Sequence, residues 1–134
     1  MSIKYKTIEK VNPRDPKAPK KSYASAVHET TVKMKGLAKG LAAKSTTASE
    51  GDVYSVLIGL RDLIVEHLER GDRVTIEGIG SFAVNLSSEG SDKPEDFHPG
   101  LIRKKKVVYT SDSEMKDNVS RMKVEKYVSK ENKK

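Results

Sequence analysis

The chain has 134 residues, a formal net charge of +7 and no cysteine, which excludes disulfides, thiolate metal ligands and cysteine nucleophiles. Only 35% of the residues are hydrophobic, and the chain contains two Phe and no Trp, so it is limited to one modest core. A second copy of the chain would supply the missing apolar cover, and we therefore expect an obligate dimer.

The positive charge is concentrated toward the two ends of the chain. Residues 1–35 contain nine Lys and Arg against three acids, residues 36–86 contain five against seven, and residues 87–134 contain twelve against nine. Clustered cations gain binding free energy near phosphates because they release condensed counterions. This distribution favours a polyanionic partner, and a solvated, solubilising surface is the alternative.

The sequence lacks the signals that mark several classes of protein. No apolar run approaches the length of a membrane span, and the first residues lack the apolar block of a signal peptide. The three histidines are scattered, and we find no glycine-rich phosphate loop and no paired base and nucleophile. We therefore expect a soluble, cytoplasmic protein that is not an enzyme and has no metal, cofactor, small-molecule substrate or membrane partner.

The N-terminal part is predicted as an extension, residues 1–33. Residues 3–9 and 21–28 have the composition of short strands, and three prolines at positions 13, 16 and 19 exclude a helix between them. The two strands are expected to pair as a hairpin whose Pro-rich loop displays basic side chains. A disordered basic tail is the alternative.

Two helices are predicted next. Apolar residues recur at spacings of three and four from Met34 and fade near Lys44, which indicates a first helix. The run Thr47-Ala48-Ser49-Glu50 is typical of a capping box, in which Thr47 caps a second helix. That helix is expected to end at about Arg70, with Gly71 as the first residue beyond it.

The second helix is apolar over most of its circumference, which is unusual at the edge of a small monomer. A second subunit would cover the extra apolar surface, whereas the alternative is a central helix in a monomer. The predicted dimer core consists of Leu57, Leu60, Ile64, Ile79 and Phe82.

Beyond the helices the period of the pattern changes to two. Residues 73–77 and 81–86 alternate and are joined by Gly78-Ile79-Gly80, which predicts a β-hairpin. A strand at 101–109 follows a polar loop, so that strands 81–86 and 101–109 form an antiparallel pair with a projecting arm.

The C-terminal part is predicted as a short helix and a tail. Ser111-Asp112-Ser113-Glu114 is typical of a second capping box, which opens the helix. Residues 34–122 are taken as the main domain. Residues 123–134 are taken as a charged C-terminal tail.

This order of elements, with Gly78-Ile79-Gly80-Ser81-Phe82 in the hairpin, resembles the HU/IHF family of bacterial histone-like DNA-binding proteins. Gly71-Asp72 and Met115-Lys116-Asp117-Asn118-Val119 match further family positions. The Pro-rich basic segment 12–21 looks like the N-terminal extension of an HU-related subgroup. The resemblance implies an α+β fold in an intertwined homodimer, with a helical body, a β-sheet saddle and two β-arms that embrace the DNA minor groove.

The implied function is architectural, largely sequence-nonspecific binding of double-stranded DNA in the nucleoid, with DNA condensation or bending. The candidate DNA-binding residues are Arg73, Gly80, Ser81, Arg103, Lys104, Lys105, Lys106, Lys20 and Lys21. Strand alternation places Lys104 and Lys106 on one face and Arg103 and Lys105 on the other. A solvated edge strand that uses lysine against aggregation is the alternative for this run.

The arm departs from the family pattern, because its tip lacks the Arg-Asn-Pro sequence whose proline wedges between base pairs. Residues 89–96 contain four acids and one lysine, and carboxylates are repelled by phosphates. Pro94 and Pro99 are the remaining candidates for a wedge. A structural or protein-interaction dimer that keeps the fold with little DNA bending is the alternative function.

Overall fold

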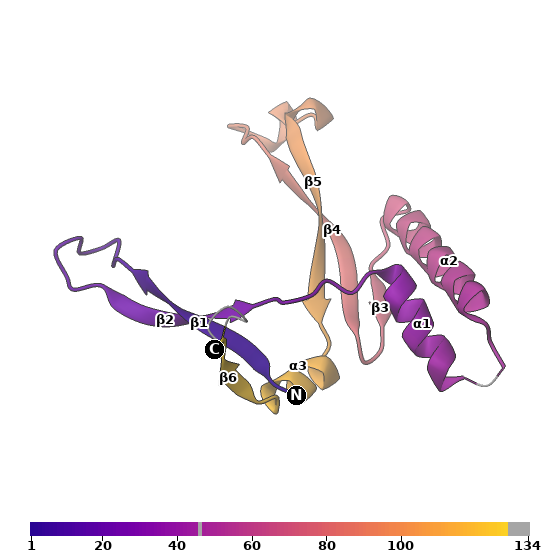
Figure 1. The fold of residues 1–134 in the computed structure, drawn as a ribbon. Helices are drawn as coiled ribbons and strands as arrows, with labels where there is room; N and C mark the ends of the chain where they lie inside the picture. Colours follow the sequence, from indigo (N-terminus) through magenta and orange to yellow (C-terminus); the bar gives the residue numbers. More distant parts are fainter. Residues whose placement is uncertain (46, 129–134) are drawn as a thin grey trace. The chain divides into compact units, whose positions relative to one another are not determined.

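The computed structural model describes residues 1–45 and 47–128 and divides the chain into two compact units. One unit combines Met1–Thr31 with the chain from Val119 onward, and the other comprises Val32–Asn118. Within the described residues there are three α-helices and two three-stranded sheets (Figure 1). The α+β fold class expected from the sequence is therefore confirmed.

The first unit is built on an antiparallel hairpin. Strand β1 (Ile3–Lys10) pairs with strand β2 (Lys21–Val27), from Lys4 opposite Val27 to Lys10 opposite Lys21. The loop between the strands contains two successive turns, in which the Asp15 N–H donates to the Asn12 carbonyl and the Ala18 N–H donates to the Asp15 carbonyl. The prolines thus lie in a turn-rich connection without helix.

A third strand joins this hairpin from the other end of the chain. Strand β6 (Val124–Lys126) lies parallel to β1, with Ile3 opposite Val124. The interpretation of residues 123–134 as a tail is therefore corrected for 124–126, and residues 129–134 lie outside the described part of the chain. A three-residue strand has too short a pattern to be recognised without its partner.

An acidic side chain of β6 is held by β1. The Glu125 carboxylate accepts a hydrogen bond from the Ser2 hydroxyl (2.7 Å) and forms an ion pair with the Lys4 ammonium (2.8 Å). These two hydrogen bonds, that of Lys4 foremost, together with the positive charge of Lys4, hold the pKa of Glu125 below its ordinary value.

A lowered carboxyl pKa stabilises the β1–β6 pairing above the unfolded pKa, and this contribution is lost as the pH falls through the folded value. We expect amide exchange at the Tyr127 N–H, which donates to the Tyr5 carbonyl, to accelerate below about pH 4, where an unperturbed Glu titrates. Glu125→Gln should remove this acid dependence and Glu9→Gln should not. Identical pH profiles for the three proteins would contradict the expectation.

The second unit begins with two helices, α1 (Met34–Lys44) and α2 (Glu50–Glu69). The predicted cap of α2 is wrong in its residue, because the Ser49 hydroxyl, and not Thr47, accepts the Asp52 N–H (3.1 Å). Ser49 directly precedes the helix in extended conformation, which is the geometry of an N-cap.

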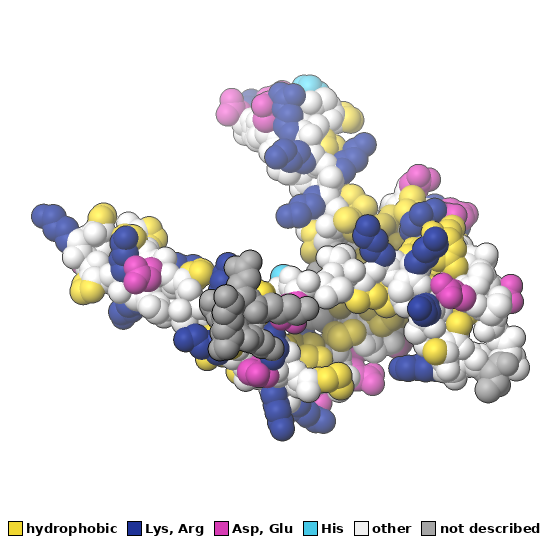
Figure 2. Space-filling view, in the orientation of Figure 1, with side chains coloured by type: hydrophobic (Ala, Val, Ile, Leu, Met, Phe, Trp, Pro, Cys, Tyr) yellow, Lys and Arg dark blue, Asp and Glu magenta, His cyan; other side chains and the backbone are white. Residues whose placement is uncertain are grey.

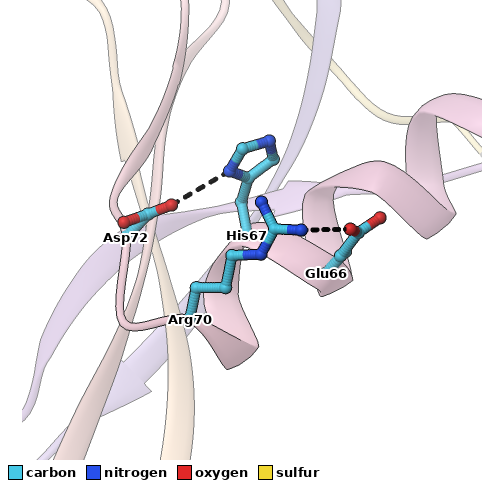
Figure 3. A network of polar contacts seen from close by, with 4 residues as sticks. All are labelled: Glu66, His67, Arg70 and Asp72. Atoms are coloured by element: carbon cyan, nitrogen blue, oxygen red, sulfur yellow. Dashed lines mark hydrogen bonds and ion pairs between the residues drawn. The ribbon is translucent and has the colours of Figure 1, made fainter.

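The end of α2 agrees with the sequence. Gly71 has φ +88°, the Gly71 N–H donates to Leu68 O, and the Asp72 N–H donates to His67 O, which together form a Schellman motif. Figure 3 shows two side-chain pairs at this turn, His67 Nδ1 with Asp72 Oδ2 (3.0 Å) and Arg70 Nη2 with Glu66 Oε1 (2.6 Å). The motif turns the chain from α2 into the sheet.

The sheet of the second unit has strand order β3 (Val74–Ile76), β4 (Gly80–Ser88) and β5 (Ile102–Ser111), all antiparallel. The predicted hairpin and the returning strand are therefore present. Strands β4 and β5 extend beyond the helices as an arm (Figure 1). The arm loop contains two short 3-10 turns, η1 (Pro94–Asp96) and η2 (Pro99–Leu101).

Helix α3 (Ser113–Ser120) follows β5 directly. The predicted capping box is wrong here as well, because Ser111 is the last residue of β5. The Asp112 carboxylate accepts the Gly78 N–H (3.1 Å), and the Asp112 N–H donates to Ile79 O. These two hydrogen bonds fasten the start of α3 to the turn between β3 and β4.

The core of the chain is small. Among the described residues, Ala38 is the only hydrophobic residue that is fully buried, and large apolar side chains on α1, α2 and β5 remain exposed. No helix in this part of the chain is both long enough and apolar enough to cross a membrane. The isolated chain therefore exposes apolar surface of the kind that usually marks an interaction site.

Candidate nucleic-acid interface

The two faces of the β3–β4–β5 sheet differ in chemistry. The inner face, which is directed toward the helices, carries Phe82 and Tyr109, whose ring centroids are 5.4 Å apart. The opposite face carries mainly polar side chains, with Ala83 and Val108 among them. Its polar members are Thr75, Ser81, Asn85, Ser87, Lys104, Lys106 and Thr110. This polar face, called the outer face below, is the candidate interface.

Two lysines stand on the outer face. Lys104 is opposite Ser87 and Lys106 is opposite Asn85, and both lysines are exposed. Lys105 lies on the inner face, opposite Leu86. The alternation in the sequence thus separates Lys104 and Lys106 from Lys105 as expected.

Arg103 has a different environment from the lysines that follow it. Ser87 pairs with Lys104 whereas Ser88 pairs with Ile102, so Arg103 is the extra residue of a β-bulge. Its guanidinium lies 2.9 Å from the Glu89 carboxylate, and both side chains are more than half exposed. The grouping of Arg103 with Lys105 on one strand face is therefore corrected, because the bulge interrupts the alternation.

The end of the arm combines both signs of charge. Figure 2 shows Lys and Arg side chains along the projecting strands and acidic side chains among them at the end. Among the described residues, Asp92, Glu95 and Asp96 form no ion pair, whereas Glu89 neutralises Arg103. An exposed pair of this kind contributes little stability. It does reduce the charge that Arg103 offers to a phosphate.

Arg73 and Ser81 lie near the same face. Arg73 is exposed and stands just before β3, two residues from Thr75, so the strand alternation continues to it. The Ser81 hydroxyl is within 2.9 Å of the Thr75 hydroxyl. Each hydroxyl retains capacity for further hydrogen bonds.

Gly80 packs closely against β5. It is buried in the central strand between β3 and β5, where neighbouring strands take up the backbone groups. With φ +154°, it lies so close to β5 that an added Cβ would overlap the Thr110 carbonyl oxygen. The expectation that backbone amides at Gly80 and Ser81 bind phosphate stays a prediction, and the Ser81 hydroxyl is the side-chain candidate at this position.

Lys20 and Lys21 belong to the first unit. Lys21 begins β2 opposite Lys10, Lys20 immediately precedes it, and both are exposed. These two lysines therefore belong to a different unit from the lysines of the outer face.

An apolar groove of about 450 Å³ runs over the helices and the inner face of the sheet. Leu57, Leu60, Ile64 and Phe82 line it together with Val107, whereas Ile79 lies in the β3–β4 turn and does not. Leu60 is 43% exposed and Val107 is 57% exposed. Four of the five residues proposed for a dimer core are thus brought together.

Some residues of the outer face and of the arm were not foreseen. Asn85 and Ser87 share the outer face with the lysines, and the register of β4 against β5 could have identified them. Phe97 is exposed between the two 3-10 turns of the arm, and no periodic pattern marks it. The Glu89–Arg103 pair depends on the bulge, which has no signal in the sequence.

Two helices that cover one face of a sheet, whose neighbouring strands extend into an arm, define an HU-like DNA-binding fold. Residues 1–126 match the family described as "HU domain fused to wHTH, Ig, or Glycine-rich motif". The chain therefore belongs to this HU-HIG family. A comparison with curated proteins found no match.

Two solved structures share the fold. A putative bacterial DNA-binding protein from Bacteroides vulgatus ATCC 8482 aligns with a TM-score of 0.67 and 11% identity, over 92% of this chain and 47% of that chain. The present chain therefore spans about half the length of that protein. HU from Anabaena, in a cocrystal with DNA, aligns with a TM-score of 0.52 and 17% identity, over 66% of this chain and 98% of that chain. About a third of the present chain thus has no counterpart in the HU protein.

Proposed function

We propose that the protein binds double-stranded DNA as an architectural, largely sequence-nonspecific component of the bacterial nucleoid. The observation that carries the proposal is the outer face, where Lys104 and Lys106 stand among hydroxyl and amide side chains on an extended arm. Cations and neutral donors in this arrangement suit phosphate contacts, which position a protein on DNA without reading bases. The HU–DNA cocrystal with a similar fold supports the same partner.

In this proposal residues 34–122 are the DNA-binding domain, residues 1–33 are an extension, and Arg73 and the Ser81 hydroxyl assist the two lysines. No cofactor or small-molecule substrate takes part, and the role is not catalytic. Lys105 faces the apolar side, so its contribution is smaller than that of its neighbours. The outer face offers no interleaved aromatic side chains, which argues against stacking on single strands.

The proposed active form is an intertwined homodimer in which a second copy covers the apolar groove. The support is the set of large apolar side chains that line the groove and stay exposed in one chain. An exposed apolar surface of this extent is unusual in a basic chain with few hydrophobic residues. The same surface of a second copy could pack against it and bury it. The dimer would also present two outer faces and two arms to one duplex.

The experiment that tests the DNA-binding proposal is an electrophoretic titration against random-sequence duplex DNA at two salt concentrations. Lys104→Gln combined with Lys106→Gln should lower the log–log salt slope by about 0.9 for each phosphate that is no longer neutralised. Arg103→Gln with Lys105→Gln removes the same charge and should have a smaller effect, because Arg103 is paired with Glu89 and Lys105 faces inward. Equal slopes for both variants and the wild type would contradict the proposal.

The acidic arm is expected to coat or bridge duplexes without sharply kinking them. Inserting a wedge unstacks a base step at a cost of a few kcal/mol, which needs neighbours that attract phosphates, and four acids oppose that approach. Changing all four, Glu89, Asp92, Glu95 and Asp96, to amides should tighten binding without adding a large bend. Binding is measured by titration and bending by energy transfer across a short duplex, with Glu69→Gln on α2 as the control for removal of an acid.

The expectation for the arm would be overturned by one result. Strong end-to-end compaction of the duplex by the wild type, abolished by Pro94→Ala or Pro99→Ala, would mean that a proline wedge operates despite the acids.

A second candidate function is favoured by the Glu89–Arg103 pair. Because the arm neutralises one of its own cations, the fold could serve as a structural or protein-interaction dimer with little DNA-bending activity. The salt titration separates the two candidates, since an interaction dimer would show no salt-sensitive duplex binding.

A further inference from the structure

The lysines of the N-terminal hairpin lie on one face of its sheet. In β1, alternate residues from Lys4 to Lys10 share a face, and the register places Lys21 opposite Lys10 on that face. This surface, called the basic face below, carries Lys4, Lys6, Lys10 and Lys21 together with Ile8, Tyr23, Ser25 and Val27. Lys and Arg side chains stand out from this hairpin in Figure 2.

The opposite face of the same sheet has a different composition. On β1 and β2 it carries Ile3, Tyr5, Thr7, Glu9, Ser22, Ala24 and Ala26. The register of β6 adds Val124 and one cation, Lys126, which is opposite Tyr5. Four lysines on one face against one on the other place the positive charge mainly on the basic face.

Among the described residues, few acids lie near the basic face. Glu125 of β6 is the only acid that the strand register places on it, and Glu125 is already paired with Lys4. Lys10 and Lys21 are directly opposite each other, and like charges in that position are destabilising. Lys10 lies over the Tyr23 ring, 5.8 Å from its centroid. An external polyanion would relieve the remaining repulsion.

The hairpin loop adds further positive charge to this unit. It carries Arg14, Lys17 and Lys20, all exposed, against one acid, Asp15. Side-chain hydrogen bonds order the loop, because the Arg14 N–H donates to the Asn12 side chain and the Lys17 N–H donates to the Asp15 carboxylate. The Asp15 carboxylate is therefore engaged in the turn.

We propose that the basic face of the β2–β1–β6 sheet is a second contact surface for duplex DNA. It binds the phosphate backbone independently of the outer face. The inference rests on the proposed function. Alternate strand residues are about 6.6 Å apart and each DNA strand presents a charge about every 3.4 Å of helix axis, so cations at this spacing suit contacts to phosphates and need no particular base sequence. Tyr23 is the one aromatic side chain that the β1–β2 register places on the basic face, and the Lys10 ammonium stands over its ring, which argues against base stacking as the main contact.

The test uses the full chain and random-sequence duplex DNA over a range of salt concentrations. Lys6→Gln with Lys21→Gln removes two basic-face charges that belong to no ion pair among the described residues. Removal of two phosphate-binding cations should lower the log–log slope by about 1.8 and weaken binding roughly 60-fold at about 0.1 M salt. Lys126→Gln removes one charge from the opposite face of the same sheet and should leave the slope unchanged, whereas Lys6→Gln alone should lower it by about 0.9.

The outcomes separate this inference from the proposed function. A wild-type slope in the Lys6 and Lys21 variant, together with a lowered slope in the Lys104 and Lys106 variant, overturns the second surface and leaves the first. Equal reductions for Lys6→Gln and Lys126→Gln overturn it as well, since general charge would then explain the effect. Absence of salt-sensitive binding by the wild type overturns the proposed function itself. Unchanged thermal midpoints of the variants confirm that the sheet is intact in each comparison.

Discussion

Leu60→Asp is expected to abolish cooperative folding and leave no stable monomer. Leu60 lines the apolar groove and is 43% exposed in the isolated chain, so a second copy that covers the groove would bury it. An unpaired carboxylate in such an interface costs about 3–5 kcal/mol, and domains of this size have only about 5–15 kcal/mol in total. Because folding and association are coupled in an obligate dimer, the destabilisation appears as unfolding.

The comparison variant for Leu60→Asp is Ser55→Asp. Ser55 is exposed on the same helix, five residues earlier, and bonds only to the Gly51 carbonyl of its own helix. A helix turns 100° per residue, so Ser55 points away from the groove, and its replacement should change stability by only a few tenths of a kcal/mol. Sedimentation and thermal unfolding measure both variants. A well-folded wild-type monomer at micromolar concentration would refute the dimer.

Gly80→Ala is expected to destabilise the second unit by about 2–6 kcal/mol, the sum of backbone strain and overpacking. Gly80 has φ +154°, and an added Cβ would overlap the Thr110 carbonyl oxygen and lie 2.6 Å from Tyr109 Cε2. The oxygen belongs to backbone that is held in β5, so the clash moves the strand that carries the lysines. Duplex binding should weaken together with stability.

Gly40→Ala provides the matched substitution. Gly40 lies inside α1 with nothing within 4 Å of an added Cβ, and Ala is favoured over Gly in a helix by about 1 kcal/mol. Thermal unfolding should therefore show the two alanine variants moving in opposite directions. A Gly80→Ala protein as stable as the wild type would show that β4 and β5 do not approach as closely as described.

The bounds of the two long helices follow from local sequence. The spacing of apolar residues from Met34 and the glycine at position 71 predict where α1 begins and α2 ends. These signals are local because helix contacts span three or four residues. The residue type alone does not identify the N-cap of α2, since Thr47 and Ser49 are both good caps. Only the backbone geometry distinguishes them.

The composition of the outer face was also determined largely by sequence. Strand alternation has period two, so Lys104 and Lys106 share a face wherever β5 pairs regularly. The environment of Arg103 required the tertiary structure, because a bulge adds one residue without a mark in the sequence. The same bulge region contains the Glu89 ion pair that offsets the charge of Arg103.

Contacts between distant parts of the chain were decided by the tertiary structure alone. The pairing of β6 with β1 joins residues about 120 positions apart, and only this pairing places Glu125 beside Lys4 on the basic face. The need for glycine at position 80 arises from the approach of β5, thirty residues later. The sequence of a segment indicates its local secondary structure through the spacing of its apolar residues. The contacts between distant segments depend on which strands pair and in which register. A short strand does not specify its partner or its register by itself.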